Sequence, residues 1–202
     1  MSYIGTQPNN VKQNIGLYNP NEILQLEKDG HWGGSLELIQ SQTVSGVTQV
    51  DFTSIKENIY DVHLMEYNVK PSADCLNYIR FSNDSGSSFE ATNYAYAWQI
   101  NDSAGGLGET KSTSSTQIYT NYGGGNSAYE KHTAYYYFYN LGDSSKYSYL
   151  TEQANTQSST GSLHSFIGGA VYKVAETING IRLYPSTGNI TGVINLYGMK
   201  EI

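Results

Sequence analysis

Gly188-Asn189-Ile190-Thr191-Gly192-Val193-Ile194-Asn195-Leu196-Tyr197-Gly198 is the stretch that most clearly indicates a fold class for this chain. It predicts a turn followed by a strand, because Ile190, Ile194 and Leu196 share one face when side chains alternate across a strand. The run Ile-Arg-Leu-Tyr at 181–184 precedes it, before a Pro-Ser-Thr break at 185–187. These features predict a strand that closes a β-sheet, and they show no sign of catalytic chemistry.

From residue 36 onward the chain repeats this pattern of strands and turns. Strands are expected at 36–44, 47–53, 59–68, 76–82, 89–100, 115–120, 132–140, 146–153, 163–172, 178–184 and 190–200. Turn-forming clusters rich in Gly, Ser, Asn and Asp separate them, at 82–87, 104–106, 123–126 and 142–145. Many short strands without a long helical period predict an all-β fold, an antiparallel β-sandwich of jelly-roll type over residues 35–202.

Residues 1–34 differ in composition from the rest and predict an extended N-terminal arm. The segment is rich in Asn, Gln, Gly and Pro, and a disordered leader is the alternative, because termini are loose unless they are tied down. A free tail would contain fewer apolar side chains, so docking on a partner is favoured. The candidate anchoring residues are Tyr3, Ile4, Ile15, Leu17, Tyr18 and Trp32.

Composition and charge argue against several classes of function. The 202 residues suffice for one domain with a sizeable core. The net charge is −7 and no Lys/Arg cluster exists, so nucleic-acid binding is not expected. No stretch approaches the roughly 20 apolar residues of a membrane span, and the N-terminus lacks the pattern of a signal peptide. The single cysteine, Cys75, excludes a disulfide within the chain and is expected to be an idle thiol.

No sequence motif indicates a cofactor or a metal. The run 105–112 approaches a phosphate-binding loop, but Thr110 stands where the second glycine is needed. The four histidines lack zinc-binding spacing. The loop expected at 101–109 offers only Asp102 and Glu109 to a calcium ion, which leaves calcium an open alternative.

Catalytic residues are not expected either. Hydrolysis of glycosides needs two carboxylates that face each other, and Glu90, Glu130 and Glu152 cannot be paired from sequence alone. The Gly-x-Ser-x-Gly turn of serine hydrolases is missing. The prediction is therefore a protein that is not an enzyme and needs no cofactor.

Tyrosine is unusually common, with 19 residues, and two strands concentrate it. The strand 132–140 places Tyr135, Tyr137 and Tyr139 on one face and further aromatic residues on the other. Such a strand lies between two layers or meets another subunit, which we favour. The alternative is that one face is in the core and the other is lightly exposed.

The second aromatic strand suggests a sugar-binding platform. Glycans stack on polar sheet surfaces that carry Tyr and Trp, and jelly rolls include many lectins. Tyr94, Tyr96 and Trp98 share one face, and Tyr122 is a further candidate. The alternative is that this face is simply the core side of the strand.

Six segments, in their order along the chain, carry a resemblance to a known family. They are 2–8, 30–39, 50–53, 78–82, 139–142 and the ending 180–182 with 196–198. The set resembles small β-sandwich virion proteins of tailed bacteriophages of marine bacteria. The resemblance implies a virion component without catalytic residues, assembled in the cytoplasm of the host bacterium, and leaves open whether it belongs to the head or the tail.

Residues and resemblance together predict a structural protein on the surface of a phage particle. It would be a head decoration or fibre, or a tail appendage, anchored by residues 1–34 to other virion proteins of the capsid or tail. A homotrimer is expected, because surface appendages are commonly closed symmetric oligomers. The alternative is a glycan-binding, receptor-binding module of a tail fibre, whose partner is a glycan on the host surface.

Overall fold

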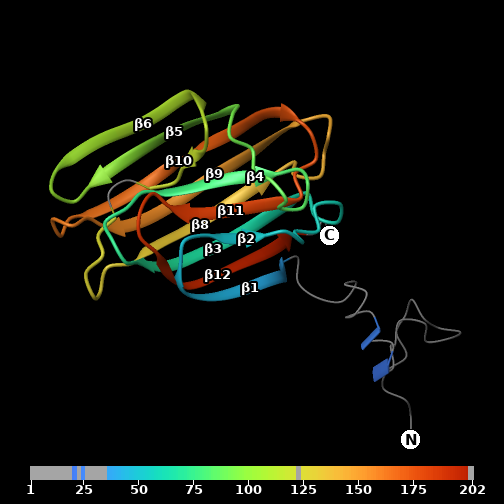
Figure 1. Ribbon diagram of the computed structural model, residues 1–202, viewed down its shortest axis with the longest axis horizontal. Helices are drawn as coiled ribbons and strands as arrows, with labels where there is room; N and C mark the ends of the chain where they lie inside the picture. Colours follow the sequence, from blue (N-terminus) through green and yellow to red (C-terminus); the bar gives the residue numbers. More distant parts are fainter. Residues whose placement is uncertain (1–19, 22–23, 26–35, 122–123, 200–202) are drawn as a thin grey trace, which may run out of the picture. The chain divides into compact units, whose positions relative to one another are not determined.

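Two antiparallel sheets packed on each other make up the body of the protein (Figure 1). The computed structural model describes residues 20–21, 24–25, 36–121 and 124–199. The chain divides into two units, Met1–Ser35 and Leu36–Ile202, and the strands of the described residues all belong to the second. The predicted anchoring residues Tyr3, Ile4, Ile15, Leu17, Tyr18 and Trp32 lie outside the described residues.

The larger sheet has eight strands and the smaller sheet has four. In spatial order the larger sheet contains β1 (Leu36–Val47), β12 (Ile190–Met199), β3 (Val62–Pro71), β8 (His132–Tyr139), β9 (Tyr147–Gln157), β10 (Leu163–Ala175), β5 (Tyr94–Asp102) and β6 (Gly106–Ser115). The smaller sheet contains β2 (Val50–Phe52), β11 (Gly180–Pro185), β4 (Asn77–Ser82) and β7 (Ile118–Tyr119). The predicted all-β sandwich is confirmed, whereas its jelly-roll connectivity stays a prediction.

The C-terminal stretch forms the strand that its apolar alternation predicts. Strand β12 pairs with β1 on one side and β3 on the other, and Ile190, Ile194 and Leu196 are fully buried. The preceding run belongs to β11 in the smaller sheet. The break at 185–187 therefore carries the chain from one sheet to the other.

Strand β6 corrects the sequence prediction of a loop at 101–109, whereas the strand expected at 115–120 contains β7 (Ile118–Tyr119). Gly106–Ser115 instead pairs along β5 and forms one edge of the larger sheet. An edge strand has a single strand neighbour and is largely exposed here, so it needs few apolar residues to hold it. Its Gly, Ser and Thr content therefore resembles that of a loop.

A short bridge closes one end of the sandwich. Gly124 pairs with Cys75, just before β4 of the smaller sheet, and with Ser158, just after β9 of the larger sheet. The Gly124 N–H donates to the Cys75 carbonyl at 3.2 Å, and the Cys75 N–H donates back at 3.1 Å. Residue 124 thus joins the two sheets at a point where the sequence indicates only a turn.

Candidate functional site

The predicted sugar platform does not lie on the surface. Tyr94, Tyr96 and Trp98 face the smaller sheet and are only 0%, 8% and 4% exposed, so they are core residues. The core accepts a tyrosine here because its hydroxyl is hydrogen-bonded: the Phe81 N–H donates to Tyr94 Oη at 2.8 Å. Tyr122 lies outside the described residues. The alternative interpretation, that this face is the core side of the strand, is the one that holds.

Two of the candidate carboxylates are kept apart. Glu152 faces the core from β9, opposite Tyr136. Glu130 precedes β8, at the end where that strand pairs with Thr156, and its carboxylate accepts the Ser127 N–H at 2.5 Å. Four strand residues, about 13 Å, separate Glu152 from Thr156. The two glutamates therefore come from backbone positions well apart along the sheet, which is not the facing arrangement that glycoside hydrolysis needs.

The buried Glu152 carboxyl makes folding stability depend on pH. Burial raises its pKa well above the usual range, and the neighbouring Tyr136 hydroxyl offsets part of the shift. The folded state therefore holds this proton more tightly than the unfolded chain, and stability falls as the pH rises above the ordinary carboxyl pKa of about 4.3.

Replacing Glu152 by Gln should remove this pH dependence. We expect the variant to be more stable than the wild type at pH 8, and this gain to be much smaller at pH 5, because the wild-type carboxyl must hold its proton or be buried as a charge at the higher pH. Urea unfolding at both pH values measures the difference. The control is Glu109→Gln, which changes an exposed carboxylate on β6. An equal effect of Glu152→Gln at the two pH values would contradict the assignment.

The acidic residues near the β5–β6 turn are not gathered into one loop. Asp102 ends β5 and pairs with Gly106, whereas Glu109 pairs with Gln99 and forms an ion pair with Lys111. Among the described residues no group of three or more His, Cys, Asp or Glu side chains is placed to hold a metal ion. The structure thus separates the two carboxylates that the sequence offers to calcium.

Cys75 is buried at the bridged end of the sandwich. Burial raises the pKa of its thiol to about 11. Because the thiolate is the reactive form, this cysteine is a poor nucleophile at neutral pH.

The face of the larger sheet that points away from the smaller sheet, which we call the free face, carries a contiguous group of exposed apolar side chains. Side chains alternate along each strand, so one set packs against the smaller sheet and the other points away from it. The registers align the outward residues of neighbouring strands into rows that cross the sheet. Two adjacent rows are mainly apolar or aromatic, and the next two are mainly polar.

The apolar rows cover one end of this free face. The first row contains Leu36, Met199, Val62, Tyr139, Tyr149, Val171 and Ala95. The second contains Leu38, Tyr197, Leu64, Tyr137, Thr151, Gly169, Ala97 and Lys111. Leu36, Leu38 and Tyr149 are 46%, 53% and 46% exposed. Monomeric soluble proteins rarely expose a contiguous apolar patch of this kind without a binding role.

Side-chain size divides these rows into a ridge and a trough. The ridge consists of Leu64, Tyr137, Tyr139, Tyr149 and Tyr197, on β3, β8, β9 and β12. The trough consists of Ala95, Ala97, Gly169 and Val171, on β5 and β10. It is a hollow of about 410 Å³ whose walls include Tyr149 and Ser112. Large and small side chains thus lie next to each other on one apolar surface.

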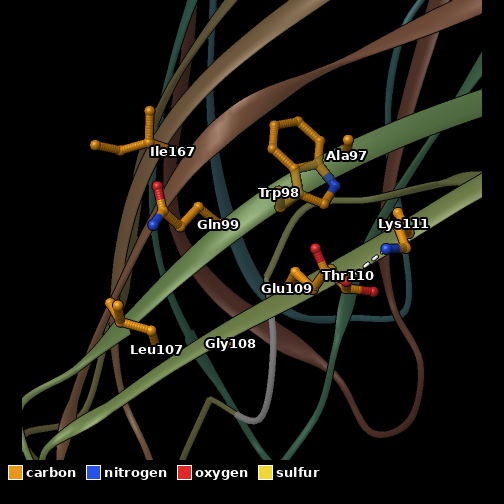
Figure 2. Close-up of a pocket in the computed structure, with 9 residues that line it drawn as sticks. All are labelled: Ala97, Trp98, Gln99, Leu107, Gly108, Glu109, Thr110, Lys111 and Ile167. Atoms are coloured by element: carbon orange, nitrogen blue, oxygen red, sulfur yellow. Dashed lines mark hydrogen bonds and ion pairs between the residues drawn. The ribbon is translucent and has the colours of Figure 1, made fainter.

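A second hollow continues from the trough toward the sheet edge (Figure 2). It has a volume of about 550 Å³ and shares Ala97 with the trough. Figure 2 shows Ile167 and Leu107 at one end of it and the Lys111–Glu109 ion pair on β6. On its β6 side the trough is therefore bordered by this ion pair.

The polar rows form a compact group on three central strands, which we call the polar grid. Its six members are Glu66, Asn68, Thr133, Tyr135, Gln153 and Asn155. Glu66, Tyr135 and Gln153 form one row across β3, β8 and β9, and the other three form the next. Together they line a hollow of about 340 Å³.

Sequence reasoning identified part of this free face and missed the rest. It placed Tyr135, Tyr137 and Tyr139 on one face of their strand, and the structure shows that face to be the outer one, with Tyr135 55% exposed. The trough was missed, although the alternation of large residues with Ala95 and Ala97 was a usable signal. When one face of a strand has only small residues, the large residues opposite are expected in the core.

Comparisons with known proteins give no relative to argue from. No family model matches the sequence, and the searches of curated proteins and of solved structures return no match. Among the described residues, no helix is long and apolar enough to cross a membrane.

Proposed function

We propose that this chain is a non-enzymatic structural protein on the surface of a bacteriophage particle, where it assembles as a homotrimer through the ridge and the trough. It would be a head decoration or fibre, or a tail appendage, assembled in the host cytoplasm and attached to capsid or tail proteins by residues 1–34. The observation that carries the proposal is the exposed apolar end of the larger sheet. The resemblance to phage virion proteins is the reason for placing the chain on a phage particle.

A second copy of the chain is the partner that best fits this surface. When two sheets pack, large side chains of one fit between small side chains of the other. Tyr137 and Tyr149 of one copy would fit against Ala97 and Gly169 of another. Interface cores are rich in tyrosine and poor in charge, and the ridge and trough contain no charged residue. The ridge of one copy would pack in the trough of the next.

Three copies fit this arrangement better than a pair stacked face to face. A face-to-face pair would also cover the polar grid and bury the Glu66 carboxylate, which is costly without a partner. A ring closed around an axis at the apolar end needs only the ridge and the trough. The polar grid then remains open to solvent.

A charge placed in the trough tests the interface. We expect wild-type protein at micromolar concentration to have three times the 22.3 kDa chain mass by light scattering, and Ala97→Glu to be monomeric. Thr43→Glu is the matched control, because Thr43 is an exposed residue of the same sheet in the polar row that contains Val193. A monomeric wild type would contradict the interface, and a dimer would contradict the threefold arrangement.

The same three proteins test the role on the particle. Wild-type protein and Thr43→Glu should co-sediment with particles of the encoding phage that were assembled without this chain. Ala97→Glu should load less, because each monomer has one attachment segment where a trimer has three. Failure of trimeric wild-type protein to bind the particles would overturn the particle-surface role.

A further inference from the structure

The polar grid has the composition of a ligand site for hydroxyl-rich molecules. Its side chains include three amides, one carboxylate and one hydroxyl around the ring of Tyr135, which is 55% exposed. Amides both donate and accept hydrogen bonds, and carboxylates accept them. The hollow of about 340 Å³ lies at the lower end of the usual range for small-molecule sites.

A chain of hydrogen bonds holds one member of the polar grid in place. Asn195 Nδ2 donates to Glu66 Oε2 at 3.0 Å, and Ser41 Oγ donates to Asn195 Oδ1 at 2.6 Å. The chain runs from β1 through β12 to β3 and fixes the orientation of the carboxylate. Because Glu66 is already ordered, a ligand that binds it loses less conformational entropy than it would at a free side chain.

The location of the polar grid limits the kind of ligand. Strands β3, β8 and β9 each have a neighbour on both sides, so their backbone groups are engaged in the sheet. An extended peptide that adds a strand to a sheet needs a free edge, which these strands do not offer. Recognition here must therefore use side chains, which favours a small polar unit over a peptide backbone.

Charge and aromaticity limit the ligand further. The polar grid contains Glu66 and no lysine or arginine, and Lys70, the next outward residue of β3, is not part of the lining. A carboxylate without a cation disfavours phosphate, sulfate and acidic sugars. The exposed Tyr135 ring offers an apolar surface of the kind on which the C–H face of a sugar ring packs.

We propose that the polar grid binds a neutral saccharide, with its ring against Tyr135 and its hydroxyls on Glu66, Gln153 and Asn155. This site uses none of the residues that the sequence suggests for glycan binding. It also does not rest on the trimer, since the polar grid lies within one chain and outside the ridge and trough.

A printed array of neutral and acidic glycans, followed by calorimetric titration with the best-bound neutral glycan, tests the site. We expect wild-type protein to bind neutral glycans on the array. Tyr135→Ala and Gln153→Ala should each raise the dissociation constant per site by about tenfold or more. Tyr147→Ala is the control, an exposed tyrosine of β9 that lies outside the polar grid, and it should change affinity by less than twofold. All three positions are exposed, so circular dichroism should show an unchanged fold.

The outcomes separate this proposal from the one on assembly. Ala97→Glu should keep the per-site affinity for the neutral glycan even when it is monomeric. The saccharide site would be overturned if wild-type protein bound no glycan or preferred acidic glycans. Equal losses of affinity in Tyr135→Ala and Tyr147→Ala would overturn it as well. Loss of affinity in Ala97→Glu would overturn its independence from the assembly interface.

Discussion

Replacing Phe81 by alanine is expected to lower the free energy of unfolding by about 3–5 kcal/mol. Phe81 is a fully buried residue of β4 in the smaller sheet. Its ring centroid lies 6.0 Å from those of Tyr94 and Phe138 and 6.1 Å from that of Tyr172, on three strands of the larger sheet. Phe81 is therefore a central contact through which the small sheet packs against the large one, and its loss leaves a cavity between them.

Two further variants distinguish a cavity from a general loss of aromatic residues. Phe81→Leu keeps most of the volume and should cost about 1–2 kcal/mol, because the cost of truncation grows with the cavity left behind. Tyr129→Ala removes a ring that is 95% exposed and should stay within about 0.5 kcal/mol of the wild type. Urea unfolding of the three variants and the wild type measures how much free energy of unfolding each variant loses. Equal losses for Phe81→Leu and Phe81→Ala would show that cavity volume does not determine the cost.

The sequence allows strands to be predicted more reliably than it allows their faces to be assigned. Alternation correctly groups Tyr94 with Tyr96, and Tyr135 with Tyr137, but the first pair is buried and the second faces outward. Which face is covered depends on where the smaller sheet lies, and strand pairing between distant segments sets that position. The information is therefore in the register of the sheet and not in the period of one strand.

The polar grid was beyond sequence reasoning for the same reason. Its members come from three segments, 66–68, 133–135 and 153–155, and each segment alone looks like the ordinary solvent side of a strand. Only the pairing of β3 with β8 and of β8 with β9 brings them together. The glycine-rich composition of 123–126 predicts a turn, but composition does not reveal that Gly124 bridges the two sheets.

Gly124→Ala is expected to destabilise the protein by about 3–5 kcal/mol, although it adds a single methyl group. A Cβ at Gly124 would lie 1.8 Å from Nε2 of His132. That imidazole is buried, and its Nδ1 accepts hydrogen bonds from Asn77 Nδ2 at 2.8 Å and Asn121 Nδ2 at 3.0 Å. Moving the ring to make room would leave buried amides without a partner, so the cost exceeds that of a steric contact alone.

Removing the His132 imidazole tests whether its clash with the added methyl group causes the loss of stability. In a His132→Ala background the methyl group has space, so Gly124→Ala should then cost less than about 1 kcal/mol, and the difference is the coupling energy between the two positions. Gly106→Ala is the control, because a Cβ there meets its nearest neighbour at an ordinary 3.7 Å, and its effect should be within about 0.5 kcal/mol. If Gly124→Ala cost the same with and without His132, the glycine would be required for the backbone bridge between Cys75 and Ser158 and not for the ring.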